Sequence, residues 1–242
     1  MNFTETVYHG FKQINFDFED RVGILVCPKD PRPDRKWLYK IEYFDAFPKF
    51  EVEMLEKGYY VAHMSNKTRW STPDDIAMWP KFCDFLIERF GLDPKCFPVG
   101  LSCGGAESVF FASCFPQYVA AMYLDAPVMN FLSCPYGLGD SEADFIEEFE
   151  KATGFTRKTL LSHRNHPLDR ISDLLRNRIP ILIISGDADK TVPYDENGKY
   201  LTEYYRQHGG IIEEIIRPGG DHHPCGLDDG RPMHEFVERY YS

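Results

Sequence analysis

A serine flanked by glycines is the clearest chemical feature of the sequence. Gly100-Leu101-Ser102-Cys103-Gly104 has the spacing G-x-S-x-G, and it lies between a short apolar run and a segment with helical spacing. In a strand–turn–helix of this kind the turning residue adopts a strained backbone conformation, so the residues two before and two after it need almost no side chain. Gly100 and Gly104 meet that requirement. The pattern predicts a nucleophile elbow that exposes the hydroxyl of Ser102; the alternative is an ordinary glycine-rich turn.

A serine hydroxyl is a weak nucleophile at neutral pH, so Ser102 needs a base to remove its proton and an acid to orient that base. After such an elbow the chain order is serine, acid, histidine, each at the carboxyl end of a strand. His222 follows the last predicted strand, and it is the predicted base. The adjacent His223 is expected to pack or to bind substrate. A metal site in this loop is the less favoured alternative, because two adjacent histidines on a Pro/Gly loop tend to diverge.

Three aspartates are candidates for the acid. Asp189 follows the apolar run 181–185 and lies far enough along its loop to reach across to the histidine, so it is preferred. Asp187 is closer to the end of that strand, where a carboxylate commonly bonds the backbone amides of its own turn. Asp125, after the preceding strand, is a further substitute.

The charge that develops on a substrate's carbonyl oxygen needs two hydrogen-bond donors. The backbone N–H of Cys103, at the start of the predicted helix, is one expected donor. The second is expected from the loop after the short strand Trp37-Leu38-Tyr39, at Lys40 or Ile41. The Cys103 thiol is not the expected nucleophile, because branched Leu101 stands two residues before it.

The apolar pattern predicts strands that alternate with helices. An alternating strand up to Phe18 and a second strand over 22–27 form an antiparallel start, and later apolar runs are separated by helical segments. This predicts one α/β domain over residues 1–242, with a mostly parallel central sheet and helices on both faces. The pattern lapses over 128–173, where we expect a small helical cap inserted into the domain.

The composition of the chain argues against some classes of binding partner. The net charge of −11 argues against nucleic acid and against an anionic membrane surface. No signal peptide is visible at the start of the chain, and the seven scattered cysteines read as reduced thiols, so a cytoplasmic location is expected. No dinucleotide or phosphate-loop motif is present, and neither a metal nor an organic cofactor is expected.

Aromatic and imidazole side chains near the predicted site are candidates for a substrate-binding wall. Such rings stack on sugars or line an apolar acyl pocket, although most aromatic side chains simply belong to the core. The candidates are Trp37, Trp70, Tyr194 and His223.

These residues resemble the α/β-hydrolase family along the whole chain, and more closely a subgroup of bacterial carbohydrate-ester hydrolases. The most specific matching pieces are Asp125-Ala126-Pro127-Val128 and Gly220-Asp221-His222-His223-Pro224; further matches lie at 36–40, 100–105 and 186–197. The resemblance implies an α/β-hydrolase fold, with Ser102 as nucleophile, Asp189 as acid and His222 as base, and an acylated sugar as substrate.

Two positions depart from that subgroup, which often has an arginine where Lys40 stands and another where Cys103 stands. Arginine and lysine differ in planar recognition, so the substrate is expected to differ from that of the subgroup. The sequence as a whole predicts a serine esterase that hydrolyses a small carboxylic ester through an acyl-enzyme. The alternatives are an amide or peptide hydrolase or an acyltransferase with the same three residues, and a binding protein that keeps the fold without turnover.

Overall fold

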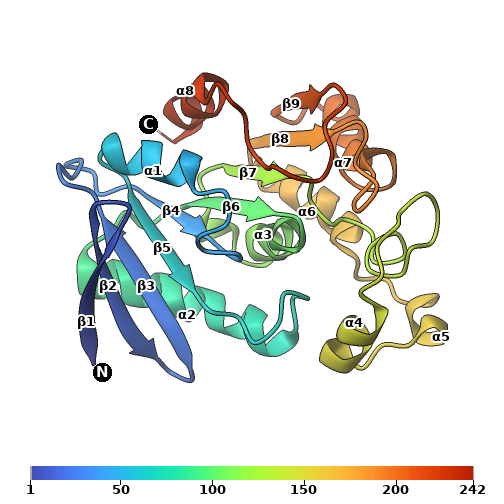
Figure 1. Ribbon diagram of the computed structural model, residues 1–242, viewed down its shortest axis with the longest axis horizontal. Helices are drawn as coiled ribbons and strands as arrows, with labels where there is room; N and C mark the ends of the chain where they lie inside the picture. The colour runs from blue at the N-terminus through green and yellow to red at the C-terminus, as the bar shows by residue number, and fades with distance from the viewer. Residues whose placement is uncertain (1, 242) are drawn as a thin grey trace.

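A single twisted sheet of nine strands occupies the centre of the part of the chain that the computed structural model describes, residues 2–241 (Figure 1). Its strand order is β1-β2-β3-β5-β4-β6-β7-β8-β9. An antiparallel section comprises β1 (Phe3–Tyr8), β2 (Phe11–Phe18) and β3 (Arg21–Cys27), and β3 pairs antiparallel with β5 (Tyr60–Met64). The parallel section continues through β4 (Trp37–Lys40), β6 (Phe97–Leu101), β7 (Met122–Asp125), β8 (Ile181–Gly186) and β9 (Ile212–Arg217). The predicted α/β architecture is confirmed, and β1 is a strand that the sequence did not indicate.

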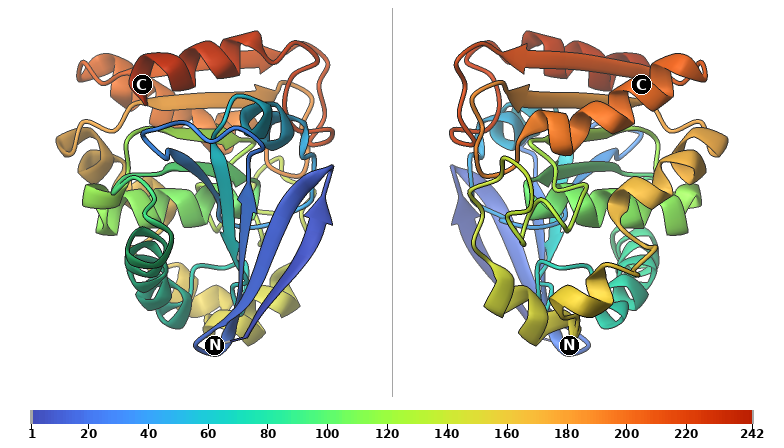
Figure 2. Two further views of the ribbon diagram at one scale, coloured as in Figure 1. Left: turned by 90° about the vertical axis from the view of Figure 1, so that its left-hand side faces the viewer. Right: turned by 90° about the vertical axis from the view of Figure 1, so that its right-hand side faces the viewer.

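Helices cover both faces of the sheet (Figure 2). On one face lie α1 (Lys49–Glu56) and α8 (Arg231–Tyr240), and on the other lie α2 (Pro73–Phe90), α3 (Cys103–Cys114), α6 (Ile171–Arg176) and α7 (Gly198–Gln207). Among residues 2–241, none of the helices is long and apolar enough to cross a membrane.

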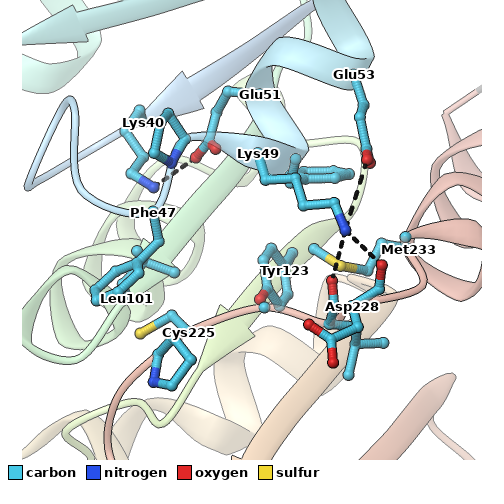
Figure 3. Close-up of a pocket in the computed structure, with 16 residues that line it drawn as sticks. Lys40, Phe47, Lys49, Glu51, Glu53, Leu101, Tyr123, Cys225, Asp228 and Met233 are labelled. Carbon is cyan, nitrogen blue, oxygen red and sulfur yellow. Dashed lines mark hydrogen bonds and ion pairs between the residues drawn. The ribbon is translucent and has the colours of Figure 1, made fainter.

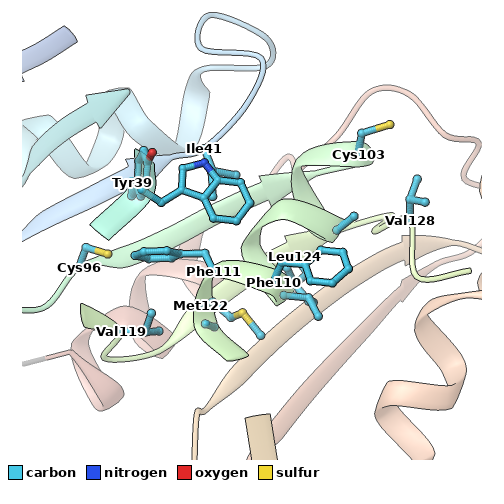
Figure 4. Packing of buried hydrophobic residues seen from close by; sticks show 14 of the residues in the cluster. Tyr39, Ile41, Cys96, Cys103, Phe110, Phe111, Val119, Met122, Leu124 and Val128 are labelled. Atoms are coloured by element: carbon cyan, nitrogen blue, oxygen red, sulfur yellow. The ribbon is translucent and has the colours of Figure 1, made fainter. Parts of the chain in front are cut away.

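The helix α3 is packed on nearly every side. Phe110 and Phe111 lie among apolar side chains of the sheet such as Tyr39 and Leu124, and all four are almost fully buried (Figure 4). Because protein interiors are close-packed, the helix cannot shift without opening a void. The start of α3, where the serine lies, is therefore fixed relative to the strands.

The helix α2 begins at Pro73 and continues through Pro80. Proline suits the first turn of a helix, where its missing N–H has no intrahelical partner. The left-handed Gly91 (φ 65°) ends the helix.

The segment between β7 and β8 carries short helices beyond the carboxyl ends of the strands (Figure 1). They are α4 (Ile146–Thr153), α5 (Arg157–Leu160) and the 3-10 turn η2 (Pro167–Arg170), with two further 3-10 turns elsewhere at η1 (Pro116–Tyr118) and η3 (Tyr194–Glu196). The helix α6 runs on to Arg176, three residues beyond the predicted end of the cap, and packs against α3. The last part of the segment therefore belongs to the helical layer of the sheet.

Candidate active site

Ser102 forms the sharp corner between β6 and α3. Its backbone has φ 52° and ψ −118°, a conformation that L-residues rarely adopt. A side chain at Gly100 would collide with the Gly104 carbonyl and the Ser108 hydroxyl, and a Cβ on Gly104 would lie 3.1 Å from that of Glu42. The predicted elbow geometry is present; glycine is required at position 100, and a side chain at position 104 would crowd Glu42.

Backbone hydrogen bonds hold this corner from two directions. The Ser102 N–H donates to the carbonyl of Asp125 at 2.9 Å, and the Ser102 carbonyl accepts from the N–H groups of Gly105 and Val128, each at 2.9 Å. A strained residue costs about 1–3 kcal/mol and persists only where its surroundings determine it. Here the loop after β7 supplies that support.

The structure brings Ser102, His222 and Asp189 together in one line of hydrogen bonds. His222 Nε2 lies 3.1 Å from Ser102 Oγ, and His222 Nδ1 lies 2.7 Å from Asp189 Oδ2. The three residues follow β6, β9 and β8, whose carboxyl ends meet at one edge of the sheet. Asp189 and His222 are buried, at 5% and 6% exposure.

The carboxylate of Asp189 is fixed by its own loop. Its Oδ1 accepts hydrogen bonds from the N–H groups of Thr191 at 2.9 Å and Val192 at 2.8 Å. Burial alone would raise its pKa, but the hydrogen bonds from His222, Val192 and Thr191 more than offset this, so the pKa of Asp189 is lowered. The group is therefore ionised at neutral pH and oriented toward the imidazole.

The other two candidate acids have different partners. Asp187 Oδ1 accepts the N–H of Gly219 at 2.6 Å and so braces a turn. Asp125 is fully buried, and its Oδ2 accepts from the Tyr123 hydroxyl at 2.5 Å and from the N–H of Gly226 at 2.7 Å. Asp125 thereby ties the loop that carries His222 to the end of β7.

The N–H of Cys103 lies at the first position of α3, where a helix leaves its amides without intrahelical partners. Burial raises the pKa of the Cys103 thiol to about 11, with the Arg69 guanidinium acting in the opposite direction. The thiol is therefore neutral at physiological pH and not activated for attack.

The second oxyanion donor is expected from the loop after β4, whose first residues have the following contacts. Lys40 is fully buried, and its ammonium donates to Glu51 Oε1 at 2.5 Å in a neighbouring cavity of about 220 Å³ (Figure 3). The Ile41 N–H donates to the carbonyl of Val99 within the sheet, at 3.4 Å. The loop after β4 brings Tyr43 to the serine's cavity, and the Tyr43 hydroxyl lies beside Cys103.

Three of the four residues expected to form a substrate wall lie elsewhere. Trp37 is fully buried between the sheet and α2, with its Nε1 donating to the Asp93 carbonyl at 2.9 Å. Trp70 is 2% exposed, and its Nε1 donates to Glu148 at 2.9 Å. The Tyr194 hydroxyl donates to Thr202 at 3.0 Å, away from the serine. When the ring of a strand or helix residue fills the core, it leaves no surface on which a ligand could stack. The sequence alone does not show toward which side of its strand or helix a ring points.

A cavity of about 350 Å³ opens beside Ser102 and His222. His223 does line it, and its ring stacks on Phe47 with centroids 5.0 Å apart. The walls are mixed: apolar side chains surround a small number of polar ones, as is common in small-molecule sites. The other lining residues are Tyr43, Ala46, Leu101, Arg69, Phe145, Thr191 and Cys225.

Arg69 is a site residue that the sequence analysis missed. It lies in the loop between β5 and α2, and the inserted segment holds it through Glu148 on α4. The only indication in the sequence was that the resembling subgroup often has an arginine directly after the nucleophile, where this chain has Cys103. The structure places the Arg69 guanidinium near that same cysteine, where it acts on the cysteine's pKa.

Among residues 2–241, no three His, Cys, Asp or Glu side chains are grouped so as to hold a metal ion. In the loop after β9, His222 faces Asp189 and Ser102, while His223 faces Phe47. The two imidazole rings nevertheless lie close together, with centroids 4.5 Å apart, although their other partners differ.

The sequence matches no protein-family model and no curated protein. Solved structures are similar in fold. Acylaminoacyl peptidase from Pyrococcus horikoshii has a TM-score of 0.71 at 18% identity, over 99% of this chain and 42% of that one. A puromycin-hydrolyzing peptidase from Mycobacterium tuberculosis has a TM-score of 0.70 at 13% identity, over 91% of this chain and 36% of that one. This chain therefore spans less than half the length of either.

The similarity at this level of identity concerns the fold. Together with the strand order, the elbow and the helices on both faces, it identifies the architecture as the α/β-hydrolase fold. Both of these neighbours are described as peptidases.

Proposed function

We propose that the protein is a serine hydrolase that cleaves a small carboxylic ester through an acyl-enzyme intermediate. The observation that carries the proposal is the unbroken line of hydrogen bonds from Asp189 through His222 to Ser102 Oγ, which ends at a cavity. A serine oxygen that is bonded to an oriented imidazole is the arrangement required for nucleophilic attack.

In the proposed reaction Ser102 Oγ bonds to the carbonyl carbon while His222 Nε2 takes the hydroxyl proton. The carbonyl oxygen becomes an oxyanion, for which the Cys103 N–H and the Tyr43 hydroxyl are the proposed donors. The bond to the leaving alcohol then breaks as the imidazolium returns the proton to it. Water, activated by the same imidazole, next cleaves the acyl-serine and restores the enzyme. Asp189 stays ionised and stabilises the imidazolium.

A sugar alcohol as leaving group is supported by the sequence resemblance. The positions of Trp37, Trp70 and Tyr194 weaken that support, because these rings would have provided the stacking wall. An amide or peptide substrate is the second candidate. It is favoured by the structural neighbours, one of which is an acylaminoacyl peptidase in complex with Z-Gly-Gly-Phe-chloromethyl ketone, with a TM-score of 0.71 at 18% identity.

A fluorophosphonate probe together with matched ester and anilide substrates tests the proposal. We expect the probe to label Ser102 and p-nitrophenyl esters of short acids to be hydrolysed faster than the anilides of the same acids. Ser102→Ala should abolish labelling and lower kcat by at least about 10⁴-fold, since the nucleophile acts as a unit with its base.

The matched control is Ser162→Ala, because Ser162 is exposed and bonds only the local carbonyl of Thr159. It should keep wild-type labelling and rate. Absence of labelling in the folded wild-type protein, or hydrolysis that survives Ser102→Ala, would overturn the proposal. A larger rate enhancement for the anilides than for the esters, each relative to its own spontaneous hydrolysis, would favour the peptidase alternative.

A further inference from the structure

The guanidinium of Arg69 is held rigidly in the wall of the cavity that contains Ser102. Its Nε and Nη2 donate to the two carboxylate oxygens of Glu148, at 2.8 and 2.5 Å, and its Nη1 lies 3.4 Å from the Tyr43 hydroxyl oxygen. The ring of Phe145 packs against it, with the guanidinium carbon 4.7 Å from the ring centroid. A cation fixed by four contacts is pre-organised, so little entropy is lost when it binds a further group.

Arg69 retains hydrogen-bonding capacity beyond these contacts. A guanidinium carries five N–H donors, and the Glu148 pair and the long contact to Tyr43 engage three of them. The side chain is 26% exposed, and it lines the cavity. Unlike the enclosed Lys40, it can therefore donate to an oxygen atom of a molecule that occupies the cavity.

The charges around Arg69 favour a neutral oxygen over a carboxylate. Glu148 offsets the guanidinium directly, and the ionised Asp189 lies behind the imidazole of the same site. The local sum of the three charges is −1, and the whole chain carries −11. A hydroxyl or carbonyl oxygen gains a charge-assisted hydrogen bond here without the repulsion that a second carboxylate would meet.

The position of Arg69 assigns this oxygen to one part of the substrate. In the proposed reaction the leaving group must lie beside His222, which returns the proton to it. Arg69 lies instead on the side of Cys103 and Tyr43, the proposed oxyanion donors. A group that reaches Arg69 therefore belongs to the acyl part.

We infer that Arg69 makes the enzyme selective for acyl groups that carry a second, neutral oxygen acceptor, a hydroxyl or a carbonyl, in addition to the scissile carbonyl. The inference rests on the proposed hydrolase function and names the substrate class of that same site. Hydroxy and oxo acids and N-acylated amino acids all belong to this class, whereas plain fatty acids and dicarboxylic half-esters do not.

Two p-nitrophenyl esters that differ only in the acyl group test the inference: pentanoate and 4-oxopentanoate. We expect the wild type to favour 4-oxopentanoate in kcat/KM, after subtraction of the spontaneous rates. Arg69→Ala should lower the ratio of the two kcat/KM values about tenfold, which corresponds to about 1.4 kcal/mol. Arg157→Ala, which removes an exposed arginine of α5, is the matched control and should leave the ratio unchanged.

A second arm tests the argument from charge. Glu148→Gln keeps an oxygen for the Trp70 Nε1 while it removes the charge that offsets Arg69. The p-nitrophenyl half-ester of succinate should then improve relative to pentanoate by at least about threefold, and more at low salt than at high salt. If the rate for the succinate half-ester relative to pentanoate is the same in Glu148→Gln as in the wild type, Glu148 does not set the preference for neutral groups.

The outcomes separate this inference from the proposed function. If the wild type hydrolyses neither ester, the proposed function fails. If it hydrolyses both and Arg69→Ala slows both equally, Arg69 acts on the common oxyanion or on folding, and the inference is wrong. Tyr43→Phe supplies the reference for that result, because loss of an oxyanion donor should slow both esters by the same factor.

Discussion

At the carboxyl edge of the sheet, two buried pairs of a basic and an acidic side chain invite comparison, because they differ in what the basic group contacts next. Lys40 and Glu51 are 2.5 Å apart with side chains 0% and 1% exposed, and His222 and Asp189 are 2.7 Å apart at 8% and 0%. The first pair borders the cavity of Figure 3, the second the cavity of Ser102. By distance and burial alone the two pairs are nearly equivalent.

The remaining contacts distinguish the pairs. The Lys40 ammonium also donates to the carbonyl of Ala46 at 3.3 Å, so it is enclosed by protein groups. The imidazole of His222 has a second nitrogen, which faces the hydroxyl of Ser102 at 3.1 Å. A buried acid–base pair is therefore a sign of chemistry when one member can exchange a proton with an atom that a ligand can reach.

The largest effect is expected when the acid of the second pair is replaced. Asp189→Asn presents an amide N–H to His222 Nδ1 and so favours the wrong tautomer of the imidazole. We expect kcat for ester hydrolysis to fall about 10⁴-fold, the size of effect that such a tautomer error produces in serine hydrolases. Steady-state kinetics on one p-nitrophenyl ester would measure it.

Asp187→Asn is the matched control, since Asp187 lies two residues earlier in the same loop and braces only the turn at Gly219. Its kcat should stay within about tenfold of the wild type. The reverse result, a large loss for Asp187→Asn and a small one for Asp189→Asn, would reassign the acid.

Breaking the first pair should change stability and leave the chemistry in place. Lys40→Met leaves Glu51 as an uncompensated buried carboxylate, so the free energy of unfolding should fall by about 3–5 kcal/mol. Urea unfolding of the variant and the wild type at neutral pH would measure the difference. The kcat of the fraction that remains folded should stay within about threefold of the wild type.

Two further variants make this result interpretable. In the double variant Lys40→Met/Glu51→Leu both charges are gone, and stability should return to near or above the wild-type value. The exposed pair of Lys190 and Glu142, with side chains 70% and 67% exposed, is the surface counterpart, and Lys190→Met should cost less than about 1 kcal/mol. A loss of activity that the double variant does not restore would give Lys40 a role in catalysis.

The sequence predicted the parts of the fold and site that depend on local steric rules. Gly100 and Gly104 indicated the corner at Ser102 because a side chain would clash at the first position and be crowded at the second. The alternation of apolar strands and helices indicated the parallel sheet. The chain order serine, acid, histidine then limited the partners of Ser102 to the loops after the last two strands. The structure places Asp189 and His222 in those loops and in contact.

The parts that the sequence did not predict depend on the direction in which a side chain points and on contacts between segments that are far apart in the chain. Trp37 alternates with Leu38 along β4, and only the packed sheet shows that the indole turns into the core. The side chain of Lys40 pairs with Glu51 on α1, a contact between segments that the sequence did not indicate. Arg69 reaches the cavity because Glu148, 79 residues away in the inserted segment, holds it there.

The smallest expected effect is the loss, in acid, of the contribution that Asp189 makes to the free energy of unfolding. The pKa of Asp189 is lowered in the folded protein, so its ionised form stabilises the fold above the ordinary aspartate pKa of about 3.9. That contribution is lost as the pH falls through the lowered pKa. Asparagine does not titrate, so the difference in unfolding free energy between wild type and Asp189→Asn should shrink as the pH falls from about 5 toward 3. Urea unfolding at these pH values would measure it. A difference that stays constant or grows in acid would mean that the pKa of Asp189 is not lowered in the folded protein.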